Sequence, residues 1–565
     1  MTSYAELVLA PQSSDVAHPA FSKMFVRTEF LARQKVLVAH RRRRAPDEPA
    51  LWASHHAVVE GITVGEPEFE TDRAKFLGRG RELRAPLAML EGRALSGTVG
   101  TVLDAVFALR YRLQIPAGGT ARIAYWTCVA GDRAQLLDLA DKHRDPNART
   151  RAATLAWTQA QVQLRHLGMD ASQANLFQQL AGHILFAGAA ARASTDNQRR
   201  GAAGPAGLWS QSISGDFPIV LLRVDDIEDL PLVRQLLQAH EYWGIKRLSV
   251  DLVILNERGA SYIQDLHVAL EAAVRISLAR PRIAGTDTRG KVFVLRSDLI
   301  TTETRALLLA VARVVLSGRR GSLADQIERM QPAPTVAPRV PRRALTVEAA
   351  SPDPEAGRKL EFFNGLGGFG AQGREYVITA PGGQSTPVPW INVVANPGFG
   401  FQVASDGGGY TWARNSRENA LTPWSNDPVT NRPGETIYLR DEESGELWTP
   451  APSPIRHEAA RYSCAHGMGY SRFEQVSHGF TLELTLLVPL EDPIKICRLR
   501  VRNDSPRRRS ISVTGYAEWV LGPSRVSGAP HILTELDSSG ALFARNPWNQ
   551  PFPGVAFADL RGAQT

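Results

Sequence analysis

The segment GGYTWARNSRENALTPWSNDP, residues 408–428, combines aromatic and polar side chains in a way that suits a binding surface. Polar groups are costly to bury without partners, so this mixture packs poorly as a core. It suits a sugar, because the C–H face of a pyranose stacks on an indole ring while its hydroxyls bond to planar polar groups. The predicted substrate-binding residues are Trp412, Arg414, Asn415, Arg417, Asn419, Trp424, Asn426 and Asp427.

A structural interpretation of the same segment stays open at this point. In that interpretation the two tryptophans form a local core on a β-domain, and Arg417 pairs with Asp427 inside a loop that satisfies its own polar groups. The two interpretations predict different consequences of removing Trp424. A packed ring would be needed for stability, whereas a ring that faces a ligand would be needed for affinity.

Motifs for other kinds of chemistry are weak in this chain. GLGGFG, residues 365–370, fits G-x-G-x-x-G, but the strand-like GREYVI follows it where a dinucleotide site needs a helix. The histidines show no metal-ligand spacing. We therefore predict no metal, no cofactor and no catalytic residue. The acidic run at residues 225–229 precedes a helical pattern, and we interpret it as helix-capping.

The composition describes a globular protein of several domains. The chain has 565 residues, of which 43% are hydrophobic and 22% are charged, and this length exceeds one ordinary core. Three widely spaced cysteines exclude a disulfide framework and indicate a reducing compartment. The net charge of +8 comes with no nucleic-acid-binding motif, and no apolar run approaches the roughly 20 residues of a membrane span. We expect a cytoplasmic location, no nucleic-acid partner and no direct membrane insertion.

The elements that must position the segment follow from strand and helix patterns. Apolar runs cut by Gly and Pro predict β-structure in residues 1–146 and again in 359–565. Between them, residues 147–330 show two helical segments, then alternating strands and helices that end in a helix over 301–318. Continuously apolar strands of this kind are typical of a parallel sheet covered on both faces. The Pro-rich composition of residues 331–358 predicts a linker.

An internal repeat links the two β-regions. TSYAELVLAP at residues 2–11 and TGYAEWVLGP at residues 514–523 match at one constant offset. We interpret them as equivalent strands in two copies of one large β-domain. The first copy then lacks its beginning and the second its end, so we expect a fragment of a longer protein. The predicted fold class is mainly β with an α/β insert: two partial β-sandwich domains flanking a helical and small α/β segment.

Several long motifs together resemble a known family. They are FFNGLGGF (362–369), GREYVI (373–378), TPVPWINVVANPGFGFQVASDGGGYTW (386–412), NSRENALTPWSNDP (415–428) and HGMGYSRFE (466–474). This set resembles the β-sandwich, or supersandwich, domain of glycoside hydrolase family 94, which contains cellobiose and chitobiose phosphorylases. Within that family it is most similar to the tandem-sandwich region of cyclic β-1,2-glucan synthases, and the resemblance covers nearly the whole chain.

The resemblance implies a part in an inverting, phosphorylase-type glycosyltransferase. In such enzymes phosphate attacks the anomeric carbon while a carboxylic acid protonates the leaving oxygen. The family carries that acid on an (α/α)6 barrel after the sandwich, and we expect it to lie outside this chain. The expected partners are β-glucan or a glucosyl oligosaccharide and the catalytic barrel of a parent synthase anchored in the inner membrane, with inorganic phosphate as its co-substrate. Three roles stay open: glucan binding or scaffolding without turnover, a structural spacer that docks the barrel, and a complete phosphorylase that uses sandwich carboxylates.

Overall fold

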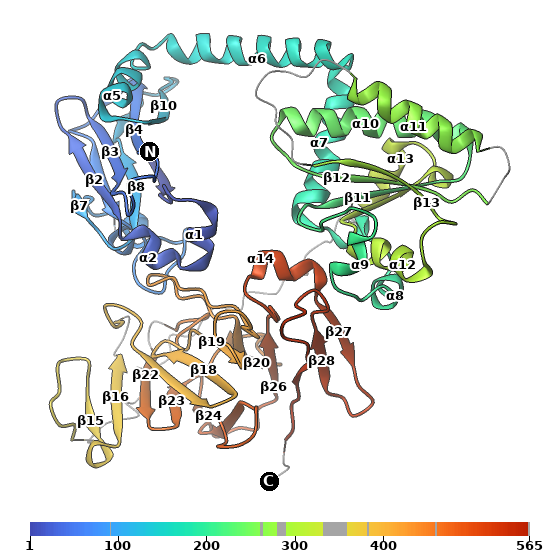
Figure 1. Ribbon diagram of the computed structural model, residues 1–565. Helices are drawn as coiled ribbons and strands as arrows, with labels where there is room; N and C mark the ends of the chain where they lie inside the picture. Colours follow the sequence, from blue (N-terminus) through green and yellow to red (C-terminus); the bar gives the residue numbers. More distant parts are fainter. Residues whose placement is uncertain are drawn as a thin grey trace. The chain divides into compact units, whose positions relative to one another are not determined.

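A computed structural model describes residues 1–90, 92–259, 264–279, 290–331, 359–380, 384–457 and 460–562. The chain forms two compact units. The first takes in residues 1–154 and 340–525, and the second takes in residues 155–339 and 526–565 (Figure 1). The predicted linker lies outside the described residues, apart from Gln331. None of the described helices is long and apolar enough to cross a membrane.

The N-terminal segment of the first unit is a β-sandwich. A five-stranded sheet in the order β10-β4-β3-β2-β7 packs against a three-stranded sheet in the order β1-β8-β6. Val26, Leu37, Phe107 and Leu109 fill the space between them and are fully buried. The strands are β1 (Thr2–Glu6), β2 (Val26–Leu31), β3 (Val36–Arg41), β4 (Trp52–Glu60), β5 (Ile62–Thr63), β6 (Glu68–Asp72), β7 (Gly100–Thr101), β8 (Ala105–Arg110), β9 (Leu113–Gln114) and β10 (Arg122–Ala130).

Five helices interrupt the described part of this segment, for which the sequence patterns predicted β-structure throughout. They are α1 (Gln12–Ala17), α2 (Pro19–Lys23), α3 (Arg73–Leu77), α4 (Leu87–Leu90) and α5 (Arg133–Lys142). The longest, α5, begins where the Asp132 carboxylate accepts a bond from the Gln135 backbone N–H at 2.9 Å. Leu136 and Ala140, four residues apart, bury one side of α5. An all-β expectation was therefore wrong for residues 133–142.

The C-terminal segment of the first unit is also built from antiparallel sheets. Six strands run in the order β15-β16-β22-β23-β24-β25, and two three-stranded sheets have the orders β17-β18-β19 and β21-β20-β26. Burial alternates residue by residue along β23 and β24, as expected for strands with one face on a core. The strands are β15 (Gly367–Gly370), β16 (Glu375–Ala380), β17 (Ile391–Asn396), β18 (Phe399–Ala404), β19 (Gly409–Ala413), β20 (Glu435–Asp441), β21 (Leu447–Trp448), β22 (Arg461–Gly467), β23 (Tyr470–Ser477), β24 (Phe480–Leu487), β25 (Ile496–Asn503) and β26 (Ile511–Ala517).

The second unit contains the predicted parallel sheet, with helices on both of its faces. Its strands run in the order β13-β12-β11-β14, and each neighbouring pair is parallel. Every residue of β12 is buried, which explains why its four central residues, 252–255, are all apolar. The elements are α6 (Ala148–Leu167), which begins in the first unit, α7 (Ala171–Phe186), α8 (Thr195–Arg200), α9 (Ala206–Trp209), β11 (Ile219–Val224), α10 (Leu230–Ile245), β12 (Asp251–Asn256), α11 (Asp265–Leu278), β13 (Val292–Arg296), α12 (Thr302–Val311), β14 (Val314–Ser317) and α13 (Leu323–Met330).

One predicted helix of this unit is wrong at its C-terminal end. The helix expected over residues 301–318 stops at Val311, and β14 follows it as the fourth strand of the sheet. Val314 and Leu316 are fully buried there. A short apolar run flanked by a helix fits a buried strand as well as a helical turn, so periodicity alone does not separate them.

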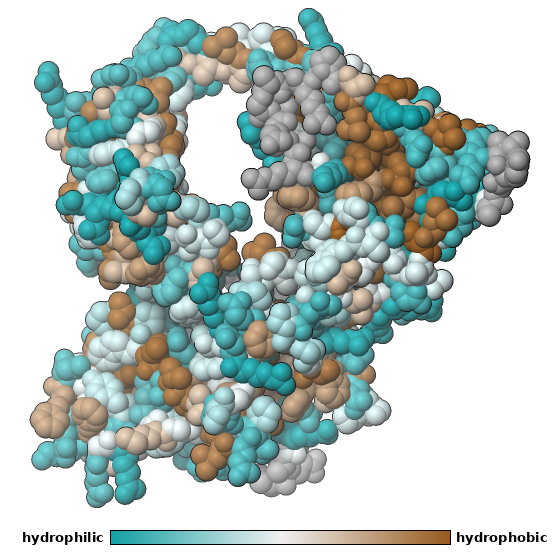
Figure 2. Space-filling view, viewed as in Figure 1, coloured by the Kyte–Doolittle hydropathy of each residue, from teal (hydrophilic) through white to brown (hydrophobic). Residues whose placement is uncertain are grey.

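Some apolar side chains of the second unit lie on its surface instead of in its core. Figure 2 shows hydrophobic residues gathered on the visible face of this unit, over the region that Figure 1 labels α10, α11 and β13. Along α11, the side chains of Val268, Ile276 and Leu278 are all more than half exposed. A short antiparallel sheet of β27 (Leu533–Leu536), β28 (Leu542–Arg545) and β29 (Ala556–Ala558) completes the unit after α14 (Arg525–Gly528).

The two copies of the internal repeat begin the same order of secondary-structure elements. Both copies begin with an edge strand of an antiparallel three-stranded sheet, β1 in one and β26 in the other. Each strand is followed by short helical segments and then by an antiparallel strand pair, β2 with β3 and β27 with β28. The strand neighbours differ, because β1 pairs with a later strand and β26 with an earlier one.

A buried histidine links the two sheets of the N-terminal sandwich. His55 bonds through Nε2 to Ser3 Oγ at 2.8 Å and through Nδ1 to Thr127 Oγ1 at 2.9 Å. Its ring stacks against Phe107 and Tyr125, with centroid separations of 5.8 and 5.7 Å. Burial lowers the pKa of His55 to about 4, so the folded protein holds this ring neutral at pH 7.

We expect the first unit to lose stability as the pH falls from neutral to about 5. The unfolded chain protonates His55 near pH 6.5, whereas the folded chain does so only near its pKa of about 4. The unfolded state therefore binds more protons in this window, and the loss at pH 5 is roughly 2 kcal/mol from this residue. Thermal unfolding of the wild type and of His55→Phe at both pH values checks this. An equal pH dependence in the two proteins would contradict it.

Candidate functional site

The predicted binding segment forms an extended hairpin on the C-terminal half of the first unit. Its first part is β19, which pairs with β18, and an isolated bridge joins Trp412 to Ala420 on the returning chain. The turn between them is closed by two asparagines. Asn415 Oδ1 accepts bonds from the backbone N–H groups of Arg417 and Glu418, and Asn419 Nδ2 donates to the Ala413 carbonyl at 3.0 Å. These amides have a structural task in the turn.

The two tryptophans of the segment belong to a row of neighbouring rings. Tyr410 stacks on Trp424 with centroids 5.6 Å apart, and it contacts Trp412 at 5.2 Å. Trp412 also covers Gly400 of β18, where a Cβ atom would lie 2.7 Å from the indole ring. Trp412 is therefore packed in part against the sheet, whereas Trp424 is 40% exposed.

The row continues onto α2 of the N-terminal sandwich and the residues on either side of this helix. Trp424 meets the His18 ring edge-to-face with centroids 5.2 Å apart, and His18 meets Phe21 at 5.8 Å. Phe21 then contacts Phe25 at 5.3 Å. We call Trp412, Tyr410, Trp424, His18, Phe21 and Phe25 the aromatic row. His18, Phe21 and Trp424 are its exposed members, and they form one surface from segments about 400 residues apart in sequence.

Hydrogen bonds fix the orientation of His18 in the row. Its Nδ1 accepts from the Phe21 backbone N–H at 3.1 Å and lies 2.7 Å from Asn426 Nδ2. A neutral imidazole that accepts at Nδ1 carries its proton on Nε2. In this tautomer His18 can donate a hydrogen bond from Nε2, and its ring adjoins that of Trp424. At the other end, the Arg44 guanidinium lies over Phe21 and Phe25, 5.2 and 5.3 Å from the two centroids.

An arginine from the N-terminal sandwich holds the base of the segment. Arg73, in α3, donates to Glu6 at 2.9 Å, to Asp104 at 2.8 Å and to both carboxylate oxygens of Asp427 at 2.7 and 2.9 Å. The Arg73 side chain is only 7% exposed. A bidentate pair of this kind fixes geometry as well as charge. It ties the two β-segments of the first unit together at this point.

Both oxygens of the Asp427 carboxylate accept hydrogen bonds from groups of the protein. Its Oδ1 also accepts from the backbone N–H groups of Val429 and Thr430 at 2.9 and 3.0 Å, and its Oδ2 accepts from the Thr430 hydroxyl. Burial would raise the pKa of Asp427, but the bonds from Arg73 and Thr430 outweigh it and hold the pKa well below the ordinary value. Burial would likewise lower the pKa of Arg73, whereas its carboxylate partners raise it. Both groups are therefore charged at neutral pH.

The structure corrects the ion pair that the structural interpretation expected. Arg417 lies 3.3 Å from Glu418, and Asp427 pairs with Arg73 instead. Arg414 and Arg417 are exposed on the turn after β19, and Arg414 takes a left-handed backbone conformation with φ of 64°. The predicted residues thus fall into three places: Trp412, Trp424 and Asn426 in or beside the aromatic row, Asp427 under it, and Arg414, Asn415, Arg417 and Asn419 in the turn.

Sequence reasoning missed the residues that the N-terminal sandwich contributes. His18 contacts the predicted segment and Arg73 anchors it, while Phe21 and Arg44 extend the surface from His18. The basic run at residues 40–44 was visible in the sequence, but nothing near it points to a segment more than 350 residues away. Such pairings arise from tertiary packing and have no local signal.

Among the described residues, no group of three or more His, Cys, Asp or Glu side chains is placed to hold a metal ion. The geometry of the site is instead that of a surface: exposed aromatic faces, a fixed imidazole donor and flanking guanidinium groups. A platform of this kind stacks on flat, weakly polar faces and bonds to hydroxyls at their edges.

The comparisons with known proteins all point to the same family. The sequence profile described as "Glycosyl hydrolase 94, supersandwich domain" matches residues 1–146 and 374–565. The cyclic beta-(1,2)-glucan synthase NdvB of Rhizobium meliloti (strain 1021) is 39% identical over 98% of this chain and 20% of its own length. The N,N'-diacetylchitobiose phosphorylase of Vibrio furnissii is 33% identical over 27% of this chain and 19% of its own. The solabiose phosphorylase of Paenibacillus borealis is 33% identical over 28% and 20%. The chain thus spans about a fifth of the length of these curated relatives.

Proposed function

The chain belongs to glycoside hydrolase family 94, and on this premise we propose that it is a carbohydrate-binding and scaffolding part of a β-glucan-processing, phosphorylase-type glycosyltransferase similar to cyclic β-1,2-glucan synthase. The proposed ligand is a β-glucan or a glucosyl oligosaccharide. Similarity to a glucan synthase across nearly the whole chain supports this ligand class. In this proposal the chain works in the cytoplasm as part of a longer synthase held at the inner membrane.

The observation that carries the proposal is the exposed part of the aromatic row. Trp424 and Phe21 are 40% and 43% exposed, and His18 lies between them with its Nε2 proton available. Large aromatic side chains at a surface bind ligands by stacking, and the indole N–H adds a donor. A glucan laid along the row would stack pyranose faces on Trp424 and Phe21 and receive a bond from His18.

The remaining predicted residues have supporting tasks in this proposal. Asp427, with Arg73, fixes the base of the segment, and Asn415 and Asn419 shape its turn. Arg414 and Arg417, exposed on that turn, are planar donors for sugar hydroxyls or for a phosphate oxygen. Preorganisation of this kind lowers the entropic cost of binding.

In this proposal the general acid of phosphorolysis lies outside this chain, as the resemblance to the family implies. Inorganic phosphate is then a co-substrate of the parent enzyme and not a resident cofactor of this part. General acid catalysis and substrate positioning each account for large shares of enzymatic rate enhancement. A part that lacks the acid should bind glucan and leave it uncleaved.

Binding without turnover is the result that tests this function. The purified chain is titrated calorimetrically with a linear β-1,2-gluco-oligosaccharide, with a maltooligosaccharide as the control glycan, and glucose 1-phosphate is assayed after phosphate is added. We expect saturable binding of the β-glucan and no release of glucose 1-phosphate. Turnover of about 1–10³ per second would contradict the proposal and favour a complete phosphorylase. Absence of binding to either glycan would favour a spacer that docks a catalytic barrel.

A further inference from the structure

A hollow lies in the first unit, on the outer face of the sheet that contains β4 and β10. Its volume is about 370 Å³, within the range of small-molecule sites, which is roughly 300–1,000 Å³. None of its lining residues belongs to the aromatic row or to segment 408–428. The lining residues are Val58, Glu60, Arg122, Ile123, Ala124, Trp126, Asp145, Pro146 and Arg149.

The floor of this hollow consists of cross-strand neighbours on β4 and β10. Arg122 lies opposite Glu60 and Ala124 opposite Val58, and Trp126 is the next lining position on the same face of β10. Arg122 and Glu60 form an ion pair at 3.4 Å. The small Ala124 and Val58 in the middle leave the space, with the indole of Trp126 at one end and the ion pair at the other.

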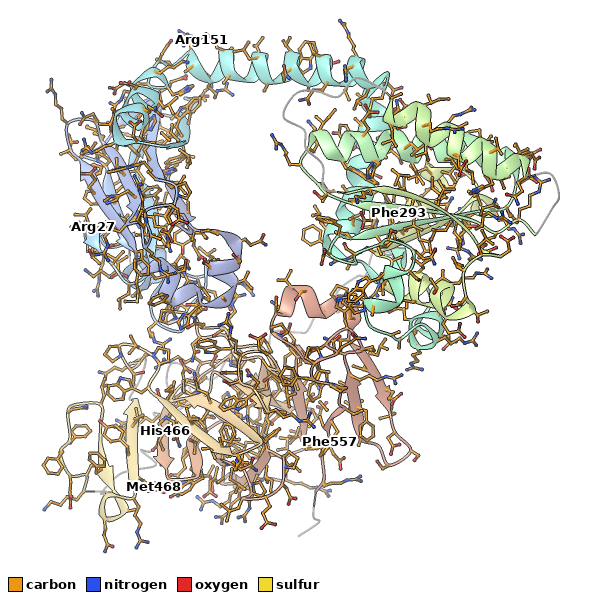
Figure 3. The ribbon with its side chains drawn as sticks, in the orientation of Figure 1. Arg27, Arg151, Phe293, His466, Met468 and Phe557 are labelled. Carbon is orange, nitrogen blue, oxygen red and sulfur yellow. The ribbon has the colours of Figure 1, made fainter. Side chains whose placement is uncertain are left out.

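The chain that follows α5 forms the opposite wall. Asp145 and Pro146 lie between α5 and α6, and Arg149 is on the first turn of α6. Asp145 is fixed by Arg151, which Figure 3 labels at the start of α6, with an Nη1–Oδ2 distance of 2.6 Å. Asp145 also accepts from the Asn147 backbone N–H at 2.9 Å. The wall therefore has a defined position relative to α6.

Two histidines that adjoin Trp126, without lining the hollow themselves, have ring nitrogens that lack a hydrogen-bond partner. His143, at the C-terminal end of α5, stacks on Trp126 with centroids 4.6 Å apart, and its buried Nδ1 has no hydrogen-bond partner. His56, directly opposite Trp126 on β4, is 2% exposed, and neither ring nitrogen has a partner. Burial lowers the pKa of His56 to about 4, so this ring is neutral at pH 7 and offers one donor and one acceptor. Buried polar groups without partners are rare and call for a ligand or water.

We propose that this hollow is a second carbohydrate site, which binds a single neutral hexose unit through stacking on Trp126 and hydroxyl bonds to its polar rim. The four ionisable lining side chains, Glu60, Arg122, Asp145 and Arg149, contribute two negative and two positive charges. That balance favours a neutral polyol over an anion. An aromatic wall with a few convergent polar groups in a site of this size is typical of small-ligand recognition.

This inference goes beyond the proposed glucan surface and does not depend on it, because the two sites share no residue. Ala124→Phe should fill the hollow with a side chain that β-strands accept, while leaving the polar rim in place. Val129→Phe is the matched control, because Val129 is an exposed residue of β10 that does not line the hollow. A third variant, Trp424→Ala, separates glucose binding here from binding at the aromatic row.

The test is saturation-transfer NMR and calorimetry with glucose, with inorganic phosphate and glucose 1-phosphate as the alternative ligands. We expect glucose to bind saturably to the wild type, Val129→Phe and Trp424→Ala, and Ala124→Phe to weaken it at least tenfold. Arg149→Ala, an exposed helical change, should weaken it several-fold, and it decides the matter if Ala124→Phe does not fold. Equal binding by Ala124→Phe and Val129→Phe would overturn the proposal. No saturable glucose binding by the wild type, or binding of phosphate alone, would also overturn it.

Discussion

Arg73→Ala should destabilise the first unit by about 3–5 kcal/mol, the cost of breaking a buried ion pair by removing one partner. The 7%-exposed guanidinium neutralises Glu6, Asp104 and Asp427, and its removal leaves three carboxylates close together. Lys23 still lies 3.1 Å from Asp104, so that carboxylate keeps one counter-charge. Asp427 and the segment it anchors lose theirs. Denaturant unfolding of the variant, followed by a probe in the first unit, measures the loss.

The matched control for this prediction is Arg417→Ala. Arg417 is 78% exposed and lies beside Glu418, so its removal should change stability by less than about 0.5 kcal/mol. A second variant, Asp427→Asn, keeps the shape of the side chain and should destabilise the unit in the same direction as Arg73→Ala. A change of under 1 kcal/mol for Arg73→Ala, about the value of a surface pair, would show that this ion pair does not join the two β-segments.

Trp424→Ala should weaken β-glucan binding about tenfold or more while the protein stays folded. A tenfold change corresponds to 1.4 kcal/mol, a modest loss for an aromatic side chain at the centre of an interface. Because Trp424 is 40% exposed, its truncation should cost less stability than the roughly 3–5 kcal/mol of a fully buried tryptophan. Phe21→Ala should act in the same direction, since Phe21 is the other exposed benzene-type or indole ring of the row, 43% exposed. Calorimetric titration and thermal unfolding of each variant separate affinity from stability.

The control for the row is Trp157→Ala. Trp157 is 66% exposed on α6 and is not a member of the aromatic row, so glucan affinity should not change. If Trp424→Ala lowers the melting temperature strongly and leaves the affinity of the remaining folded protein intact, Trp424 is a structural residue. That outcome would restore the interpretation in which the tryptophans serve as local core.

The architecture was predictable where one pattern excluded the others. Apolar residues alternate along β24, and helical segments separate the mostly apolar runs of β11 and β12, so strands and a parallel sheet followed from the sequence. The stretch 312–317 directly follows a helical pattern and fits both a strand and a helix, and its pairing with β11 decided for a strand. The short apolar face of α5 was hidden among β-type runs in the same way. The predicted domain limits at residues 146, 330 and 358 stay predictions.

The candidate site was predictable only in its C-terminal half. The tryptophans of segment 408–428 stood out by residue type, because aromatic rings among amides and guanidinium groups are unusual in a core. Arg73 and His18 did not, because their partners Asp427 and Asn426 lie 354 and 408 positions away along the chain. The sequence also suggested Arg417 as the partner of Asp427, since proximity in sequence is the only guide before packing is known. Contacts of this range depend on how whole sheets dock.

The most direct measurement of the central claim is a crystal structure of this chain with a linear β-1,2-gluco-oligosaccharide at saturating concentration. The account predicts pyranose rings stacked on Trp424 and Phe21, with a sugar hydroxyl within hydrogen-bond distance of His18 Nε2. A hexose in the hollow beside Trp126 would be a separate finding and would not replace this one. An oligosaccharide bound only elsewhere, or an aromatic row that stays free of sugar when it is open to solvent in the crystal, would contradict the account.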